Sequence, residues 1–133
     1  MRSRPTTGER GAAVVDFVLV SVLVLALFLV VLQVGIVLHV RNVLVSSAQE
    51  GARHAANADV DVAEGRGVAL ASVATALSTQ IADSAAGSPP SVLVPLGDGL
   101  TAVEVTLDAA VPLVLPIAAI HLRVTGHAVR EGG

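Results

Sequence analysis

The sequence contains no cysteine, tryptophan or tyrosine, and its aromatic residues are Phe17 and Phe28. Without cysteine there is no disulfide, no thiolate metal site and no cysteine nucleophile. At 2% aromatic content the chain lacks the stacked rings on which single-stranded nucleic acids bind. A formal net charge of −3 provides no basic surface for DNA or RNA. We therefore expect no nucleic-acid partner.

Charged residues are also scarce, at 14% of 133 residues, whereas soluble domains contain about 25%. Because hydrophobic residues make up 53%, the low hydrophobicity and high charge that are typical of disordered chains are both missing. The length allows one modest domain beside any membrane segment.

An uncharged run extends from Phe17 to Leu38, and its apolar side chains are interrupted at Ser21, Gln33 and Gly35. As an α-helix it would be about 33 Å long, enough to cross a hydrocarbon core of about 30 Å. It is too long for a buried helix in so small a domain, and longer than the roughly 7–15 apolar residues of a cleaved secretory signal. The run therefore predicts a membrane-spanning helix.

The arginines at its two ends predict the orientation of the span. Arg2, Arg4 and Arg10 precede it, whereas Arg41 and Arg53 follow it. Since cytoplasmic flanks carry the excess of basic residues, we expect a single-pass protein of the inner (cytoplasmic) membrane with a cytoplasmic N-terminus and an extracytoplasmic C-terminal domain.

One acidic residue, Asp16, stands at the edge of the apolar run. A carboxylate costs about 2.5–3.5 kcal/mol at the centre of a spanning helix and less near the interface, so one interpretation is that Asp16 marks the interface and stays hydrated. Gly11 precedes Asp16 by five positions, and a short polar segment with arginines precedes Gly11. This arrangement resembles a prepilin leader: a short basic segment, a glycine, four small or apolar residues, an acid and an apolar helix.

The resemblance implies that a prepilin peptidase cuts between Gly11 and Ala12 on the cytoplasmic side, which makes Asp16 the fifth mature residue. The new ammonium group at Ala12 and the carboxylate of Asp16 would lie about 6 Å apart along the helix axis. In a helical stack, the carboxylate of one subunit would pair with the ammonium of its neighbour and fix their register. Phe17 would follow as the first residue of the apolar helix, and both Asp16 and Phe17 are predicted assembly residues.

Within this class the segment from Glu9 to Arg53 resembles the TadE-like family of tight-adherence pilus and secretion systems. The similarity includes the Gly-Ala-Ala-Val-Val-Asp-Phe stretch at 11–17, the Val/Leu-rich helix and the Ala-Gln-Glu-Gly-Ala-Arg stretch at 48–53. The family usually has glutamate where this chain has Asp16. The long C-terminal part looks like that of a minor pilin, or pseudopilin, rather than a main pilin.

The implied partners are other pilin subunits, prepilin peptidase, the pilus assembly platform and the membrane. We expect no enzymatic activity, no cofactor and no small-molecule substrate. The alternative is an unprocessed signal-anchored membrane protein that displays a small binding or regulatory domain.

The remaining sequence predicts a small α+β domain. A helical stripe continues past the membrane and ends near Asn57 and Asp59. A second helix is predicted from Val62 to Asp83, with a capping-box-like start at Asp61 and Glu64. The residues of the first stripe are Val40, Leu44, Ala48, Ala52 and Ala55, and those of the second are Leu70, Val73, Ala74, Leu77 and Ile81.

Three strands complete the prediction. Residues 91–96 are a short apolar run, Gly97-Asp98-Gly99 predicts a three-residue hairpin loop, and residues 103–108 and 120–125 alternate apolar with polar side chains. This pattern indicates an antiparallel sheet that is covered on one face by the helices. The fold class is thus membrane-anchored, pilin-like α+β, divided into a leader (1–11), a spanning helix with its extension (12–58) and an extracytoplasmic domain (59–133).

The apolar stretch from Val111 to Ile117 has two open interpretations. Pro112 and Pro116 should keep it out of a central strand. It is then either an exposed contact for a neighbouring subunit or the membrane, or a segment that tucks against a helix.

The four histidines do not predict a metal site. His39 and His54 are about 22 Å apart on one helix, and His121 and His127 are about 20 Å apart on one strand, whereas the ligands of one metal ion meet within a few ångströms. Glu50 shares a helix face with Arg53 and His54, which predicts a surface ion pair. We find no motif of a catalytic site.

Overall fold

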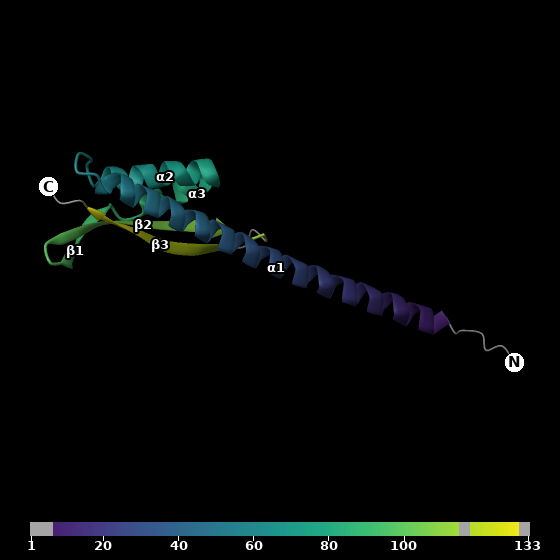
Figure 1. Cartoon of the computed structure of the whole chain (residues 1–133). Coiled ribbons are helices and arrows are strands. Elements are labelled where there is room, and N and C mark those ends of the chain that lie inside the picture. Colours follow the sequence, from purple (N-terminus) through teal and green to yellow (C-terminus); the bar gives the residue numbers. More distant parts are fainter. Residues whose placement is uncertain (1–6, 115–117, 131–133) are drawn as a thin grey trace. The chain divides into compact units, whose positions relative to one another are not determined.

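The computed structural model describes residues 7–114 and 118–130, and it divides the chain into two units, Met1–Gly35 and Ile36–Gly133. Helix α1 (Thr7–Ala56) is continuous over 50 residues (Figure 1). Its end at Ala56, just before Asn57, confirms the predicted extension of the apolar helix.

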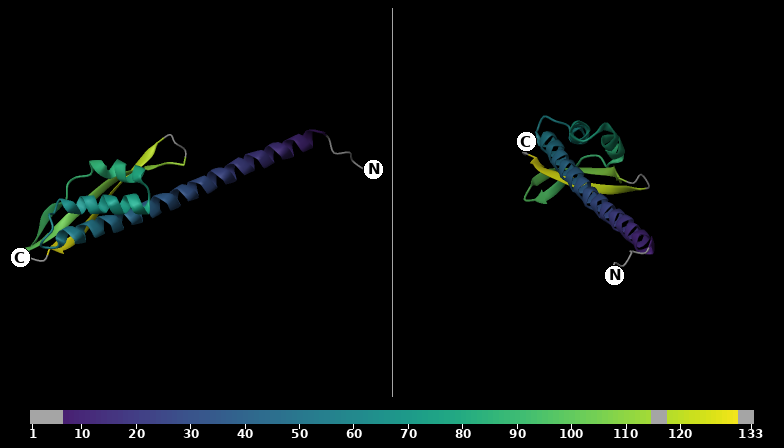
Figure 2. Two further views of the ribbon diagram at one scale, coloured as in Figure 1. Left: turned by 90° about the horizontal axis from the view of Figure 1, so that it is seen from above. Right: turned by 90° about the vertical axis from the view of Figure 1, so that its right-hand side faces the viewer.

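The second unit is an α+β domain, as the sequence predicts. After α1 come α2 (Glu64–Ala76), α3 (Thr79–Ser84) and a short 3-10 helix η1 (Ala85–Gly87). Three antiparallel strands follow in the spatial order β1-β2-β3, which makes β2 the central strand. The strands are β1 (Val92–Gly97), β2 (Leu100–Pro112) and β3 (Ala119–Arg130). The helices of this unit lie on one face of the sheet (Figure 2).

The core lies between that face and the helices. Along β2 the side chains alternate: Val103, Val105 and Leu107 are buried, whereas Glu104 and Thr106 are half-exposed on the opposite face. All five residues of the predicted α1 stripe are at most 4% exposed. Val73 of the second stripe is buried, and its other four residues pack against the core. The periodicities of 3.6 and 2 therefore identified the core-facing side chains correctly.

Glycines allow the backbones of this unit to approach closely. A Cβ added at Gly51 of α1 would lie 2.9 Å from the Cβ of Ala69 in α2, and one added at Gly65 of α2 would lie 2.9 Å from the Cβ of Ala55. A Cβ added at Gly126 of β3 would lie 2.6 Å from the carbonyl oxygen of Ala48. Helix α1 therefore rests directly on both α2 and β3.

The second predicted helix is in fact two helices. Ser78 has extended dihedrals (φ −168°, ψ 157°), and its Oγ accepts a hydrogen bond from the N–H of Ile81 at 3.3 Å. A serine that caps the following helix interrupts the preceding one, because its side chain competes for backbone hydrogen bonds.

The predicted capping box is also wrong. The N-cap of α2 is Ala63, without a side-chain hydrogen bond, and helix α2 begins at Glu64. The carboxylate of Asp61 instead accepts a hydrogen bond from the N–H of Ala63 at 3.0 Å and shapes the preceding turn.

The first hairpin turns over two residues rather than three. Gly97 pairs with Leu100, so Asp98 and Gly99 alone form the turn. Both have positive φ (53° and 78°), as required of the two central residues of a type I′ turn, and Asp-Gly is a favoured pair there. The three-residue prediction missed that Gly97, at φ 90°, still belongs to the ladder.

The prediction for Val111–Ile117 is wrong at its start, because the central strand β2 includes Val111 and Pro112. Upstream, the N–H groups of Asp108 and Ala110 point away from β3 and donate to the hydroxyls of Ser88 and Ser84 (2.8 and 3.0 Å). Since N–H groups two residues apart point to the same edge, a proline at 112 removes a donor from this edge and none from the ladder with β3.

The described part of this stretch is buried at its start and exposed at its end, and a contact there with a neighbouring subunit or the membrane stays a prediction. Val111 is in the core, Leu113 is half-buried and Val114 is exposed. Residues 115–117 lie outside the described part of the chain.

Candidate functional site

The N-terminal part of α1 presents an exposed apolar surface. Within the described residues, one helix is long and apolar enough to cross a membrane, with a mean hydropathy of 3.1 in its most apolar window. None of that window is buried within the chain. The hydroxyl of Ser21 donates to the carbonyl oxygen of Phe17 at 2.8 Å, so this polar group needs no water. These properties are those of a membrane anchor.

The predicted processing residues lie on this exposed helix. Gly11 and Ala12 are exposed, and a Cβ added at Gly11 would meet no atom within 4 Å. Of the predicted leader, residues 1–6 lie outside the described part of the chain. Both residues of the predicted cleavage bond are thus exposed, while the cut itself stays a prediction.

The predicted assembly residues are exposed as well. Asp16 has no ion pair or hydrogen-bond partner among the described residues. It lies four residues after Ala12, so both are on the same helix face, one turn apart. The side chain of Phe17 is 72% exposed. An unpaired carboxylate followed by an apolar surface is suited to meeting a cation on another chain.

Three histidines form pairs on the surface of the second unit. The Nε2 atom of His127 lies 2.9 Å from Oε2 of Glu104, directly across the β2–β3 ladder. Arg123 donates to the carboxylate of Asp108 at 2.8 Å, and His121 lies 3.7 Å from the same carboxylate. These pairs are exposed, so each contributes at most about 1 kcal/mol to stability.

The remaining pair joins His54 of α1 to Glu64 of α2 at 3.8 Å. Throughout the part of the chain that the structure describes, no three His, Cys, Asp or Glu side chains gather as metal ligands would.

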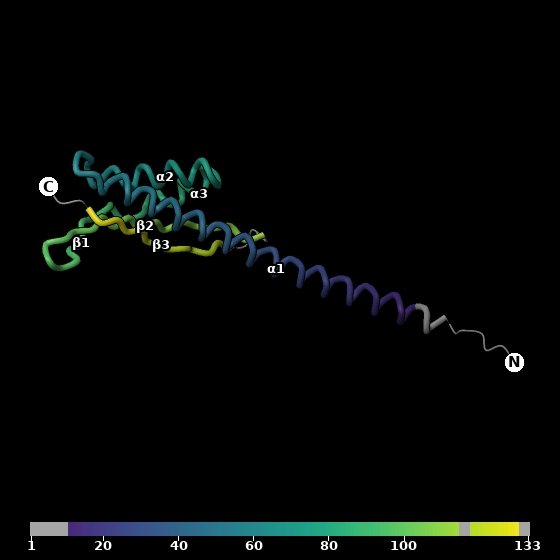
Figure 3. Tube along the Cα trace, viewed as in Figure 1, coloured from purple at the N-terminus to yellow at the C-terminus, as the bar shows by residue number. Residues whose placement is uncertain are grey.

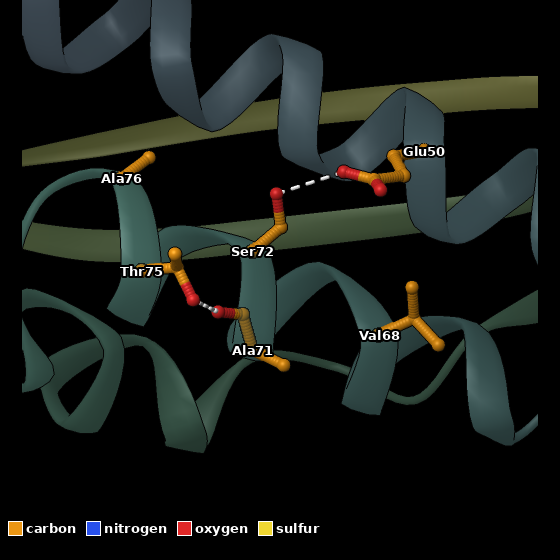
Figure 4. A pocket seen from close by; sticks show the side chains of 6 residues that line it. All are labelled: Glu50, Val68, Ala71, Ser72, Thr75 and Ala76. Atoms are coloured by element: carbon orange, nitrogen blue, oxygen red, sulfur yellow. Dashed lines mark hydrogen bonds between the residues drawn. The ribbon is translucent and has the colours of Figure 1, made fainter.

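Glu50 does not form the ion pair that the sequence predicts. Its Oε2 accepts a hydrogen bond from the hydroxyl of Ser72 at 2.8 Å (Figure 4). The hydroxyl of Ser47 in turn donates to that of Ser72 at 3.2 Å. The prediction was wrong because it considered α1 alone, whereas the contact at Gly51 brings α2 alongside.

A shallow hollow beside this contact is lined almost entirely by residues without ionisable side chains. Glu50 is the one ionisable residue among the six that line it, so the hollow lacks a partner for acid–base work. The lining residues are Glu50, Val68, Ala71, Ser72, Thr75 and Ala76.

Two serines with structural roles were not anticipated from the sequence. Ser84 and Ser88 accept hydrogen bonds from the β2 backbone, and Arg66 donates to the carbonyl oxygen of Ser88 at 2.7 Å. The one sequence signal is that Ser88 immediately precedes Pro89-Pro90, where a helix cannot continue.

Comparison with known families finds one match. The model of the family described as TadE-like protein matches residues 11–53, which confirms the resemblance drawn from the Gly11–Phe17 motif and the apolar helix. No curated protein and no solved structure matches the chain.

Proposed function

From the match of residues 11–53 to the TadE-like family, we propose that this chain is a minor pilin, or pseudopilin, of a tight-adherence type IV pilus or related secretion system. It acts as a structural subunit without catalysis of its own. Its N-terminus faces the cytoplasm, α1 crosses the inner membrane, and the α+β unit lies outside. Its partners are other pilin subunits, prepilin peptidase and the assembly platform.

One observation carries the proposal: the family match begins at Gly11, the residue after which the leader would be removed. Asp16 follows at the required spacing, on an exposed helix face that continues into 22 uncharged residues. An anchor that only held a domain at the membrane would need the apolar helix but not this glycine and acid at its start.

Processing prepares the chain for assembly. The cut removes three arginines and Glu9, which leaves five arginines against ten carboxylates. It also frees an ammonium group at Ala12, one helical turn from Asp16. In a stack of subunits each charge then finds a partner, whereas in a lone subunit the carboxylate opposes burial. The charges therefore favour ordered assembly.

The intact mass of the membrane-extracted protein tests processing. Coexpressed with its native prepilin peptidase, the chain should lose residues 1–11. Gly11→Leu should block the cut because the bulky side chain occupies the recognised position. Gly8→Leu, a glycine replacement within the leader itself, is the matched control and should still be cut.

A full-length chain beside an active peptidase contradicts the proposal and favours the alternative, a signal-anchored membrane protein that is never processed.

A further inference from the structure

Strand β3 lies at the edge of the sheet, with β2 on one side of it (Figure 3). The N–H groups of Asp108 and Ala110 point away from β3, so these residues belong to the pairs of the ladder that do not exchange hydrogen bonds. Their partners are odd-numbered residues of β3, whose N–H and C=O groups therefore point away from β2. No group of the described residues binds these backbone groups. The residues of this row, here called the outer edge of β3, are His121, Arg123, Thr125, His127 and Val129, and all are exposed.

The outer edge of β3 lacks the backbone features that protect an exposed strand from pairing. Natural proteins protect such edges with proline, with bulges or with very short strands. Strand β1 follows this rule, because it is 6 residues long, contains Pro95 and has an irregular register between Pro95 and Gly97. Strand β3 is 12 residues long, pairs with β2 in unbroken register and contains no proline. Its edge is therefore suited to pair with a further extended segment.

Basic side chains along the outer edge determine which segment can pair there. His121, Arg123 and His127 are each more than half exposed, and their carboxylate partners, Asp108 and Glu104, lie on the β2 side. Arg123 binds Asp108 through Nε and Nη2, and His127 binds Glu104 through Nε2. The Nη1 atom of Arg123 and the Nδ1 atom of His127 have no partner among the described residues. Because opposite charges across a ladder stabilise it and like charges destabilise it, this edge favours an acidic segment.

We propose that the outer edge of β3 binds an extended acidic segment of a partner protein, which adds to the sheet as a fourth strand. Backbone hydrogen bonds provide affinity, and carboxylates opposite Arg123 and His127 select the partner. The β3 strand of a second copy fits less well, because α1 rests directly on β3 at Gly126. Paired strands are about 4.8 Å apart, whereas packed helices need about 8–10 Å, so two β3 strands paired at this level would bring their α1 helices into collision. The edge belongs wholly to the second unit, so its binding does not depend on removal of the leader.

Amide hydrogen exchange, measured by NMR on the full-length chain in detergent micelles, tests this proposal. The probe is a capped peptide of about nine residues in which threonine and glutamate alternate, which is about 30 Å long when extended. The same peptide with lysine in place of glutamate is the control. Without peptide, the N–H groups of Arg123, Thr125 and His127 should exchange fast, because they point away from β2. Those of Val124 and Ala128 point into the ladder and should exchange slowly.

Millimolar glutamate peptide should slow exchange at the three outer-edge groups by about tenfold or more and leave Val124 unchanged. Arg123→Gln should weaken this protection, whereas Arg53→Gln, the same loss of charge at an exposed position on α1, should not.

Three results overturn the proposal. The first is an absence of protection by the glutamate peptide. The second is equal protection by the lysine peptide, or an equal response of the two arginine variants, because either shows that charge does not select the partner. The third is protection of the outer edge without peptide, which shows that the chain itself or a second copy already covers it.

Discussion

At the scale of single residues, the glycines of this protein differ sharply in what surrounds them. A Cβ at Gly126 would lie 2.4–2.6 Å from the backbone of Ala48 and Gln49, which cannot rotate away as a side chain can. A Cβ at Gly67, inside α2, would meet nothing within 4 Å. Packing therefore requires the first glycine, whereas the second only lowers the helix propensity of its segment.

We expect Gly126→Ala to destabilise the second unit by about 1–3 kcal/mol, because α1 must move off β3. Gly67→Ala should stabilise it by about 0.5–1 kcal/mol. Thermal unfolding of the full chain in detergent, followed by circular dichroism, measures both. Equal midpoints for the two variants would show that α1 and β3 are not in close contact.

At the scale of elements, serine side chains rather than a fourth strand bind the backbone N–H groups of β2 that point away from β3 in its second half. The hydroxyl of Ser88 accepts from the N–H of Asp108 and donates to the carbonyl oxygen of Ala85, and the residue is 3% exposed. The hydroxyl of Ser84 accepts a hydrogen bond from the N–H of Ala110, but Ser84 is exposed. The two serines thus make the same kind of hydrogen bond to β2, Ser88 from a buried position and Ser84 from an exposed one.

Ser88→Ala should cost about 1–3 kcal/mol, because it leaves the part-buried N–H of Asp108 without its partner. Ser84→Ala should cost less than about 1 kcal/mol, because water replaces the lost hydroxyl. Amide hydrogen exchange provides the local measurement, and protection of the Asp108 N–H should fall in the first variant. Unchanged protection of the Asp108 N–H in this variant would show that Ser88 does not hold the edge of β2.

At the scale of the whole molecule, charge is distributed in two different ways. In the second unit the carboxylates on the outer sheet face have partners within the chain, as Glu104 has in His127. On the described part of the first unit Asp16 has none. A carboxylate without a partner at the head of an apolar helix is expected to find it on another subunit.

Asp16→Asn should therefore leave processing intact and strongly reduce incorporation into the assembly, because the ionic partner of the neighbouring ammonium group is lost. Asp16→Glu, which restores the residue usual in the family, should retain incorporation and serves as the control. The ratio of assembled to membrane-retained subunit, measured by immunoblot of sheared and membrane fractions, decides between them. Normal incorporation of the Asn variant would refute the pairing role.

The sequence by itself determined the long helix, the stripe from Val40 to Ala55 and the alternation along β2. These features follow from hydrophobic periodicity, which depends on neighbours three, four or two residues away. The Gly11–Asp16 spacing is local in the same sense, which is why the family resemblance was readable from the chain alone.

The tertiary structure alone decided which polar groups meet. Glu50 binds Ser72, 22 residues away, and Ser88 binds the backbone of Asp108, 20 residues away. The first pair depends on the close contact of α1 with α2 at Gly51 and Gly65, and the second on the packing of the segment after η1 against β2. Neither contact leaves a periodic pattern in the sequence.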